Sequence, residues 1–205
     1  FFFTVSARPS LIVELGTRGG ESTRALLAAA SFTGSLVLSV DIHDCDGLKL
    51  PFRDRWHFVK ADDVAFGTSG FVDWCRCHAL VPTVDVLFID TSHECVHTTN
   101  ELETWTRHLS QRGTIILHDS NMGEGVYSRT DGTVSVGWDN NRGVIRALEH
   151  FLARDYDERA FFYDVTSEFL VYHYPYCNGL TVLQRYRSDC LPRSVTADAA
   201  QATRR

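Results

Sequence analysis

The sequence predicts an α/β fold in which helices cover both faces of a doubly wound, mainly parallel sheet of seven strands. Two observations carry this prediction. Short apolar runs alternate along the chain with segments of helix-forming residues, the order expected for parallel strands joined by right-handed crossovers. Near the end of the chain, two apolar runs follow one another with only a turn between them, which predicts an antiparallel hairpin at one side of the sheet.

The expected strands are short apolar runs, typical of strands that are covered on both faces. The run LIVEL is followed at once by glycines, and VDVLFID is the clearest strand of the chain. The last two runs are expected to form the hairpin. In chain order the strands are residues 11–15, 36–41, 57–63, 84–90, 113–119, 168–174 and 180–186.

Helices are expected between these strands. Residues 20–30 are rich in helix formers, and residues 94–109 place their apolar side chains at mixed three- and four-residue spacings. A further helix is expected at 143–154. The pair Cys75 and Cys77 is expected inside another helix, and the six scattered cysteines are expected to be reduced, mostly buried thiols, in preference to disulfides or a zinc site.

Length and composition indicate one domain. The chain has 205 residues, of which 44% are hydrophobic, enough to bury one sizeable core. We expect residues 1–187 to form this domain and residues 188–205 to form a polar tail. Because the chain opens with an apolar triplet and reaches its first strand almost at once, we also expect that an amino-terminal segment is missing.

The charge balance excludes some classes of function. Lysine and arginine number 20 against 26 acids, which gives a net charge of -6, and only Arg204 and Arg205 form a basic pair. A nucleic-acid partner is not expected, since it needs a concentrated positive patch. No apolar run approaches the roughly 18 residues of a membrane span, and the first residues lack a signal peptide's charged start. A cytoplasmic protein without a membrane partner is expected, with a homo-oligomer left open.

Acidic residues end four successive strands. They are Asp41, Asp62 or Asp63, Asp90 and Asp119. Taken singly, each could be a helix cap or a turn residue. Because ligands of such sheets bind beyond the carboxyl ends of the strands, four acids in series predict a ligand site there.

The segment ELGTRGGES at 14–22 joins the first strand to the first helix. Gly16 allows a tight turn, the later glycines let the backbone approach a ligand, and the helix amino terminus offers free N–H donors. The segment is not G-x-G-x-x-G, and Glu14 lies just before it. Both features argue against the pyrophosphate of a dinucleotide at this helix end.

These motifs together resemble class I methyltransferases, which have a Rossmann-like fold. Within that class the chain is most similar to the branch of cephalosporin-hydroxylase-like and macrolide-sugar O-methyltransferases, which is methyltransferase family 24-like. The resemblance covers most of residues 11–187. It is carried by ELGTRGGES, Asp41, FIDTSHECVHTTNELETW at 88–105, GTIILHDS at 113–120 and NGLTVLQR at 178–185.

The resemblance implies that S-adenosylmethionine is the cofactor and that the glycine loop wraps its methionine part. Asp41 would accept hydrogen bonds from the ribose hydroxyls; it lies 21 residues after Gly20, near the roughly 20-residue offset of the related dinucleotide fold. Asp62 or Asp63 would lie near the adenine, or else serve in a turn. Other expected contacts are Glu14, Gly16, Thr17, Arg18, Gly20, Ser22 and Asp90.

His93 is the candidate catalytic base. Methyl transfer to a hydroxyl needs a group that removes the proton, and a histidine with an ordinary pKa of about 6.5 can accept it at cellular pH. His93 lies three residues after Asp90, at the mouth of the fourth strand. The alternative is that His93 only caps the following helix.

Asp90 and Asp119 end neighbouring strands and could hold one magnesium ion, which prefers oxygen ligands. The resemblance implies an acid after the fourth strand, and an acid followed by an acid or amide after the fifth. The sequence matches at Asp90 and Asp119 but has Ser120 at the next position. His118 could replace the missing ligand or be an ordinary strand-end residue, so magnesium is left open.

Residues 120–141 are expected to form a substrate lid, because they contain Tyr127, Trp138, Asp139 and Asn140, and aromatic rings beside amides pack well against sugars or flat rings. An ordinary surface connection is the alternative. His43 and Asp44 are expected to form a turn rather than line the cofactor pocket.

The sequence therefore predicts an S-adenosylmethionine-dependent O-methyltransferase acting on a small hydroxylated molecule, a sugar or a secondary metabolite. Two alternatives remain. One is a catalytically inactive cofactor-binding module, which the Ser120 departure would allow. The other is an NAD-dependent oxidoreductase.

Overall fold

The computed structural model describes residues 1–122, 126–128, 132–136 and 142–186. The expected tail at 188–205 lies outside the described residues. Of the residues named for the expected lid, Trp138, Asp139 and Asn140 also lie outside them, as does the side chain of Tyr127.

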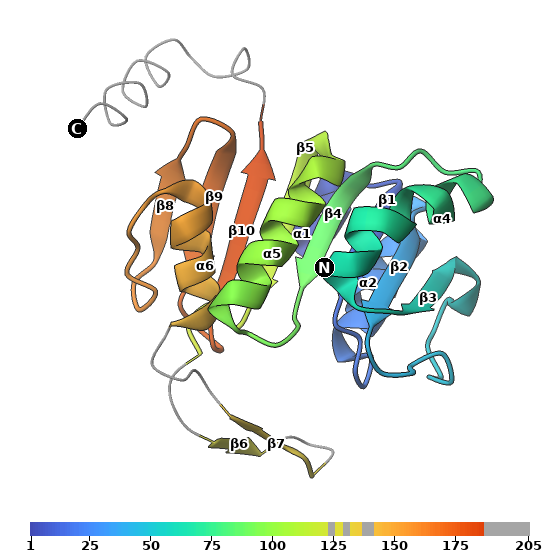
Figure 1. The fold of residues 1–205 in the computed structure, drawn as a ribbon, viewed down its shortest axis with the longest axis horizontal. Coiled ribbons are helices and arrows are strands. Elements are labelled where there is room, and N and C mark those ends of the chain that lie inside the picture. Colours follow the sequence, from blue (N-terminus) through green and yellow to red (C-terminus); the bar gives the residue numbers. More distant parts are fainter. Residues whose placement is uncertain (123–125, 129–131, 137–141, 187–205) are drawn as a thin grey trace.

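An eight-stranded sheet forms the centre of the described protein, in the order β3-β2-β1-β4-β5-β10-β9-β8 (Figure 1). The first five strands of this order pair in parallel, and β10, β9 and β8 pair antiparallel to their neighbours. The predicted mainly parallel sheet with an antiparallel hairpin is confirmed. The strands are β1 Leu11–Leu15, β2 Leu36–Asp41, β3 Trp56–Lys60, β4 Val84–Ile89, β5 Leu109–His118, β8 Phe162–Val165, β9 Phe169–Tyr174 and β10 Leu180–Arg185.

The prediction of seven strands missed β8. This strand is the edge of the sheet and pairs only with β9 among the described strands, so its side chains are at most half-buried. An edge strand of four residues does not need the apolar run that identifies a central strand.

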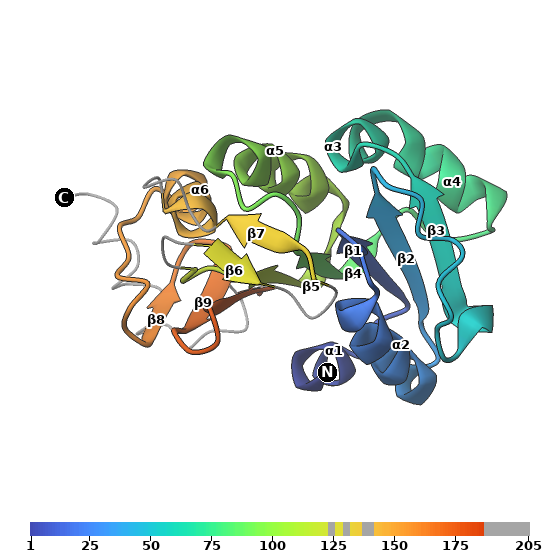
Figure 2. The same ribbon diagram turned by 90° about the horizontal axis from the view of Figure 1, so that it is seen from below.

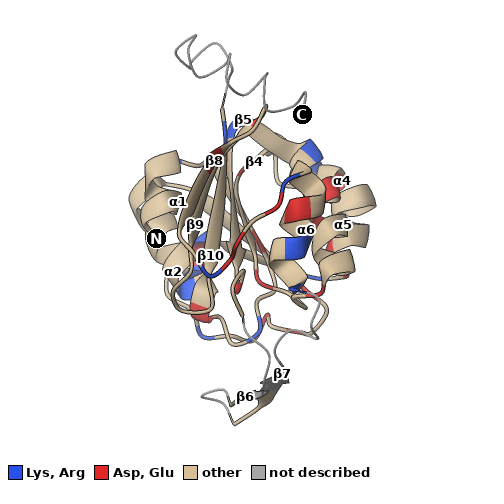
Figure 3. Ribbon diagram, turned by 90° about the vertical axis from the view of Figure 1, so that its left-hand side faces the viewer, with Lys and Arg blue, Asp and Glu red and all other residues tan. Residues whose placement is uncertain are grey.

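Helices cover both faces of the sheet (Figure 2; Figure 3). The helices α1 and α2 lie on one face, and α3 to α6 lie on the other, as the doubly wound prediction requires. Helix α1 was not predicted. None of the described helices is long and apolar enough to cross a membrane. Their bounds are α1 Phe2–Ala7, α2 Glu21–Thr33, α3 Asp63–Ala65, α4 Phe71–Cys77, α5 Cys95–Trp105 and α6 Gly143–Leu152.

Several predicted boundaries differ from the structure, and three of them have a clear structural cause. The third strand ends at Lys60, because Asp62 caps the next helix and Asp63 begins it. The helix predicted to reach residue 109 ends at Trp105 and continues as a short 3-10 turn. The following strand begins four residues earlier than predicted, because Leu109 pairs with Val84 of β4.

The core lies on both sides of the central strands. Successive side chains of a strand point to opposite faces, and Ile12 accordingly packs with α2 while its neighbours in β1 pack toward α4, α5 and α6. Trp105 and Leu148 belong to the cluster on the face covered by α4, α5 and α6, and both are fully buried. The largely apolar sequences of β1 and β4, in which Glu14 and Asp85 are the acidic residues, follow from this double burial.

The expectation of mostly buried cysteines is wrong for the described residues. Cys45 and Cys75 are buried, whereas Cys77 and Cys177 are exposed. Cys77 is the last residue of α4, and Cys177 lies in the β9–β10 turn, so neither faces the core.

Part of the expected lid forms a separate hairpin of β6 Val126–Ser128 and β7 Val134–Val136. The hairpin extends beyond the end of the sheet at which β5 ends (Figure 1). It therefore lies on the side where the parallel strands present their carboxyl ends.

Candidate active site

A cavity of about 400 Å³ lies beyond the carboxyl ends of β1, β4 and β5. Its volume falls within the range of about 300 to 1,000 Å³ that is usual for small-molecule sites. It brings together the glycine loop, the two strand-end acids and both candidate histidines. The lining residues are Gly16, Thr17, Arg18, Glu21, Ser22, Asp90, Thr91, His93, His118, Asp119, Met122, Ser128 and Asn178.

A larger hollow of about 570 Å³ lies beside α6 and contains none of the predicted site residues. Its Arg142 already forms ion pairs with Glu149 and Glu158. These carboxylates neutralise the guanidinium, so we place the active site in the smaller cavity.

The glycine loop is fixed against the end of β4. Gly16 has a φ of 85°, and a Cβ at this position would lie 2.1 Å from the carbonyl oxygen of Asp90. Its N–H donates to the carbonyl of Val40 in β2. Gly20 is the N-cap of α2 with a φ of 78° and is not part of the cavity lining. These contacts set the loop directly beside Asp90.

Asp41 holds the same loop from the end of β2. One carboxylate oxygen accepts the N–H groups of Thr17 at 2.8 Å and Arg18 at 3.0 Å, and the other accepts the N–H of His43. Burial alone would raise the pKa of Asp41, but these hydrogen bonds outweigh it and lower the pKa. Asp41 does not line the cavity, so its contact with a ribose stays a prediction. His43 is exposed and Asp44 accepts the N–H of Asp46, as expected of a turn.

Glu14 lies beneath the cavity and does not line it. The side chain points to the α2 face of the sheet, is fully buried, and accepts hydrogen bonds from the hydroxyls of Ser22, Thr23 and Ser39. Burial raises the pKa of Glu14 to about 7, although the three hydroxyls oppose the shift. Glu14 therefore ties β1 to α2 and β2, and its contact with the cofactor stays a prediction.

Glu14→Gln is expected to change how stability depends on pH. The pKa of Glu14 is about 7 in the folded protein against 4.5 ordinarily, so the folded chain binds the proton more tightly. Stability from this group is then full below about pH 4.5 and falls by about 3 kcal/mol as the pH rises to about 7. Glutamine does not titrate. Urea unfolding between pH 4.5 and 8 should show the wild type losing this amount relative to Glu14→Gln, and parallel profiles would contradict the buried carboxylate.

Asp62 and Asp63 both lie away from the cavity. Asp62 caps α3 by accepting the N–H of Ala65 at 2.7 Å. Asp63 is buried against His97 and Glu101 of α5. The structure supports the alternative turn role for Asp62. Neither Asp62 nor Asp63 is among the residues that line the cavity, so neither is seen where it could contact the adenine.

Asp90, His93, His118 and Asp119 form one cluster at the ends of β4 and β5. The Nε2 atom of His93 lies 3.1 Å from Asp90 and 3.3 Å from Asp119. The Nδ1 atom of His118 lies 3.5 Å from Asp90 and 3.0 Å from Asp119. His93 and Asp119 both have positive φ, 61° and 53°, which turns their side chains toward the cluster. The two histidines thus bridge the two carboxylates.

Charge complementarity dominates this cluster. Burial would raise the pKa of Asp90, but hydrogen bonds from His118 and His93 outweigh burial and lower it. The hydrogen bonds of His118 to Asp119 and Asp90 raise the pKa of His118 to about 10. The Asp90 carboxylate is therefore available in the ionised form at neutral pH.

The residues of the cluster fit a divalent cation. Asp90, His93 and Asp119 each offer a ligand atom within 4.8 Å of the others. Nδ1 of His118 and Oδ1 of Asp119 are buried and lie 3.0 Å apart, but neither atom has a partner with full hydrogen-bond geometry in the described part of the chain. Ser120 is not part of this set, because its buried hydroxyl is bonded to His173 and Thr181 inside the sheet.

Several lining residues were not predicted from the sequence. Glu21 and Thr91 are close in sequence to predicted residues, and their positions could have been inferred from the loop and strand ends. Asn178 comes from the β9–β10 turn, where its carbonyl accepts the N–H of Asn121. Only the pairing of β10 with β5 brings this turn to the cavity.

A family model described as a methyltransferase domain matches residues 13–120, which is more than half of the chain. This match spans the glycine loop and the whole four-residue cluster. No curated protein matched the chain.

Solved structures share the fold at low sequence identity. An SAH-bound methyltransferase of Podospora anserina has 18% identity and a TM-score of 0.53, over 91% of this chain and 76% of that chain. An O-methyltransferase of Bacillus cereus in complex with SAH has 16% identity and a TM-score of 0.56, over 90% and 78%. The MycE methyltransferase of mycinamycin biosynthesis, in complex with Mg, SAH and mycinamycin VI, has 16% identity and a TM-score of 0.54. The match covers 90% of this chain and 47% of that chain. At these identities the likeness establishes the fold.

Proposed function

Because the chain belongs to this family of methyltransferase domains, we propose that it transfers a methyl group from S-adenosylmethionine to a hydroxyl of a small molecule, with magnesium assistance. The observation that supports a hydroxyl as the methyl acceptor is the position of His93, a candidate base that lies between two carboxylates at the cavity. A sugar or a secondary metabolite is the proposed class of acceptor, in keeping with the structurally similar MycE methyltransferase, whose structure is a complex with mycinamycin VI.

The glycine loop supports the cofactor assignment. Thr17, Arg18 and Ser22 line the cavity where the loop passes from β1 into α2. Glu21, in the first turn of α2, adds a carboxylate to the lining, and a cationic sulfonium is favoured by acidic neighbours. Asp41 acts on the loop by fixing its backbone, as the hydrogen bonds to Thr17 and Arg18 indicate.

His93 is the proposed base for the transfer step. The acceptor oxygen forms a bond to the methyl carbon while the bond from that carbon to sulfur breaks and sulfur keeps the electron pair. Nε2 of His93 donates its hydrogen to Asp90 and Asp119, so the hydroxyl proton moves to the other ring nitrogen, Nδ1, and the two carboxylates stabilise the imidazolium that forms. Asp90 and Asp119 are the proposed holders of magnesium, which would lower the pKa of the acceptor hydroxyl. The raised pKa of His118 argues against the ligand role that the sequence suggested for it.

Calorimetric titration with S-adenosylmethionine and with NAD tests the cofactor. We expect S-adenosylmethionine to bind and NAD not to bind, because the loop lacks the dinucleotide pattern. A panel of hydroxylated acceptors, followed by mass shift with and without chelator, tests the reaction. Binding of NAD alone would refute the methyltransferase reading. Cofactor binding without product on any acceptor would indicate an inactive binding module.

A further inference from the structure

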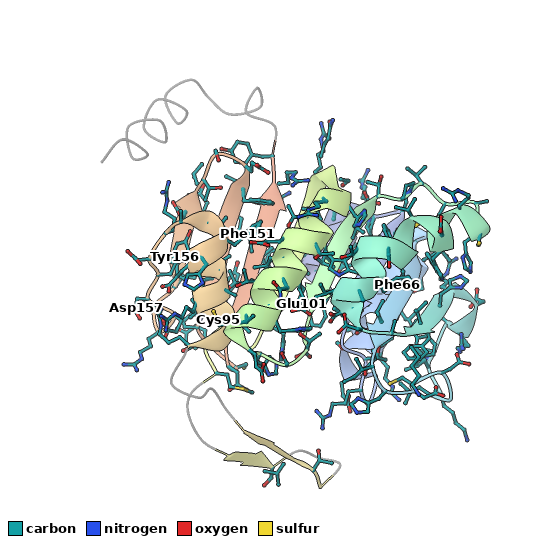
Figure 4. The ribbon with its side chains drawn as sticks, in the orientation of Figure 1. Phe66, Cys95, Glu101, Phe151, Tyr156 and Asp157 are labelled. Atoms are coloured by element: carbon teal, nitrogen blue, oxygen red, sulfur yellow. The ribbon has the colours of Figure 1, made fainter. Side chains whose placement is uncertain are left out.

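We propose that Asp63, His97 and Glu101 form a second divalent-cation site, of the zinc type, outside the cavity and between α3 and α5. These three residues have no part in the proposed methyl transfer. Two of them lie one helical turn apart on α5, and the third begins α3. Figure 4 labels Glu101 on α5 and Phe66, which directly follows α3.

The distances within this triad match those between ligands of one metal ion. Nε2 of His97 lies 3.3 Å from Oδ1 of Asp63 and 3.5 Å from Oε1 of Glu101. Two ligands bound at about 2.1 Å with tetrahedral angles are roughly 3.4 Å apart. Hydrogen-bonded pairs of ionised groups would instead approach to about 2.7–2.9 Å. Nε2 of His97 also makes a long hydrogen bond, of 3.4 Å, with Oδ2 of Asp63. The spacing of the triad is compatible with an ion between its members.

Unpartnered buried oxygens point to the same conclusion. Glu101 is fully buried and Asp63 is 6% exposed. Oε2 of Glu101 and Oδ1 of Asp63 have no hydrogen-bond partner among the described residues. Burial and the neighbouring Asp63 raise the pKa of Glu101 well above its ordinary value. A buried carboxyl group without a partner is costly. A divalent cation would displace the proton of Glu101 and supply the missing partner for both oxygens.

The nature of the donors favours zinc over magnesium. One imidazole nitrogen and two carboxylates suit a borderline cation, whereas magnesium prefers oxygen ligands alone. The side chain of His97 is 29% exposed, which leaves a route for the ion and room for a water as fourth ligand. Oε1 of Glu101 also accepts a hydrogen bond from Thr91 at 2.8 Å, which orients the carboxylate.

The proposed site would join α3 to α5 next to the active site. Thr91 lines the cavity and contacts Glu101 directly. A bound ion would therefore hold the segment after β4 in place through this threonine, without touching the cofactor or the acceptor.

Zinc titration of the full chain tests the proposal, in a background of Asp90→Asn and Asp119→Asn that removes the cavity cluster. We expect one Zn²⁺ per chain and a Tm increase of roughly 5–10 °C at zinc well above Kd. Adding His97→Ala should weaken zinc binding by at least about 100-fold. Removing a residue that only hydrogen-bonds to a metal ligand typically weakens binding by about 10- to 100-fold. Cobalt in place of zinc should give the visible absorption of a tetrahedral site, lost in the same variant.

Two controls separate this site from surface binding and from misfolding. His78 contacts His57 on the surface, and His78→Ala removes that competing pair without touching the triad. Glu101→Gln keeps the shape of the buried side chain, and circular dichroism reports whether each variant folds. Zinc binding that survives His97→Ala in the folded protein, zinc binding lost in His78→Ala, or no zinc bound by the folded parent would each overturn the proposal.

Discussion

Replacing His93 with asparagine is expected to lower kcat for methyl transfer by about 100- to 10,000-fold, the usual contribution of a positioned general base. Nδ1 of His93 is the proton acceptor in the proposed step, because Nε2 faces Asp90 and Asp119, and asparagine cannot take up that proton. The affinity for S-adenosylmethionine should change little, because that ligand is assigned to the glycine loop. Initial rates by mass spectrometry and cofactor titration by calorimetry measure the two quantities.

Asparagine is the informative substitution because His93 has a φ of 61°, a conformation that asparagine tolerates better than most residues. A loss of activity in His93→Asn would then reflect the missing imidazole and not a strained backbone. His57→Ala, a histidine of β3 that packs against His78 and Trp74, is the control and should keep full activity. Activity of His93→Asn within tenfold of the wild type would remove His93 as the base.

Gly16→Ala is expected to destabilise the protein by about 3–5 kcal/mol, from a left-handed φ and a steric overlap together. The new Cβ would lie 2.1 Å from the carbonyl oxygen of Asp90, and neither backbone can move without displacing the loop or the end of β4. A shift in Tm of about 10 °C or more is expected for a chain of this size. Thermal unfolding followed by circular dichroism measures it.

Gly34→Ala is the matched control. Gly34 ends α2 with a φ of 80°, close to the 85° of Gly16, but no atom lies within 4 Å of its added Cβ. It should lose only the cost of the left-handed backbone, about 1–2 kcal/mol. If the two variants lost equal stability, the contact between the glycine loop and Asp90 would be of no consequence.

Much of the site followed from the sequence because it depends on strand ends. Each parallel strand places its last residue at the same edge of the sheet, and the runs ending at Asp90 and Asp119 were visible without a structure. The glycine loop was equally visible. Thr17, Arg18, Ser22, His93 and His118 are found in the cavity lining with them.

Side-chain direction was not predictable in the same way. Glu14 belongs to the glycine motif, yet its place in β1 turns it to the α2 face, where three hydroxyls hold it. Asp63 ends a run that looked like a strand, but the capping of α3 by Asp62 sends it toward α5. A local pattern gives the position of a residue along an element and does not give the neighbours that compete for its polar atoms.

The sequence by itself determined the order of the seven predicted strands and of the helices between them, the parallel sheet, and the strand ends at which the candidate site lies. These properties depend on hydrophobic periodicity and on glycine, which act over a few neighbouring residues. Only the tertiary structure decided that Asp41 and Glu14 support the loop, that Asn178 reaches the cavity, and that Asp63 meets His97 and Glu101. Those contacts join residues that are far apart in the chain. They are determined by packing between elements, which no local sequence pattern records.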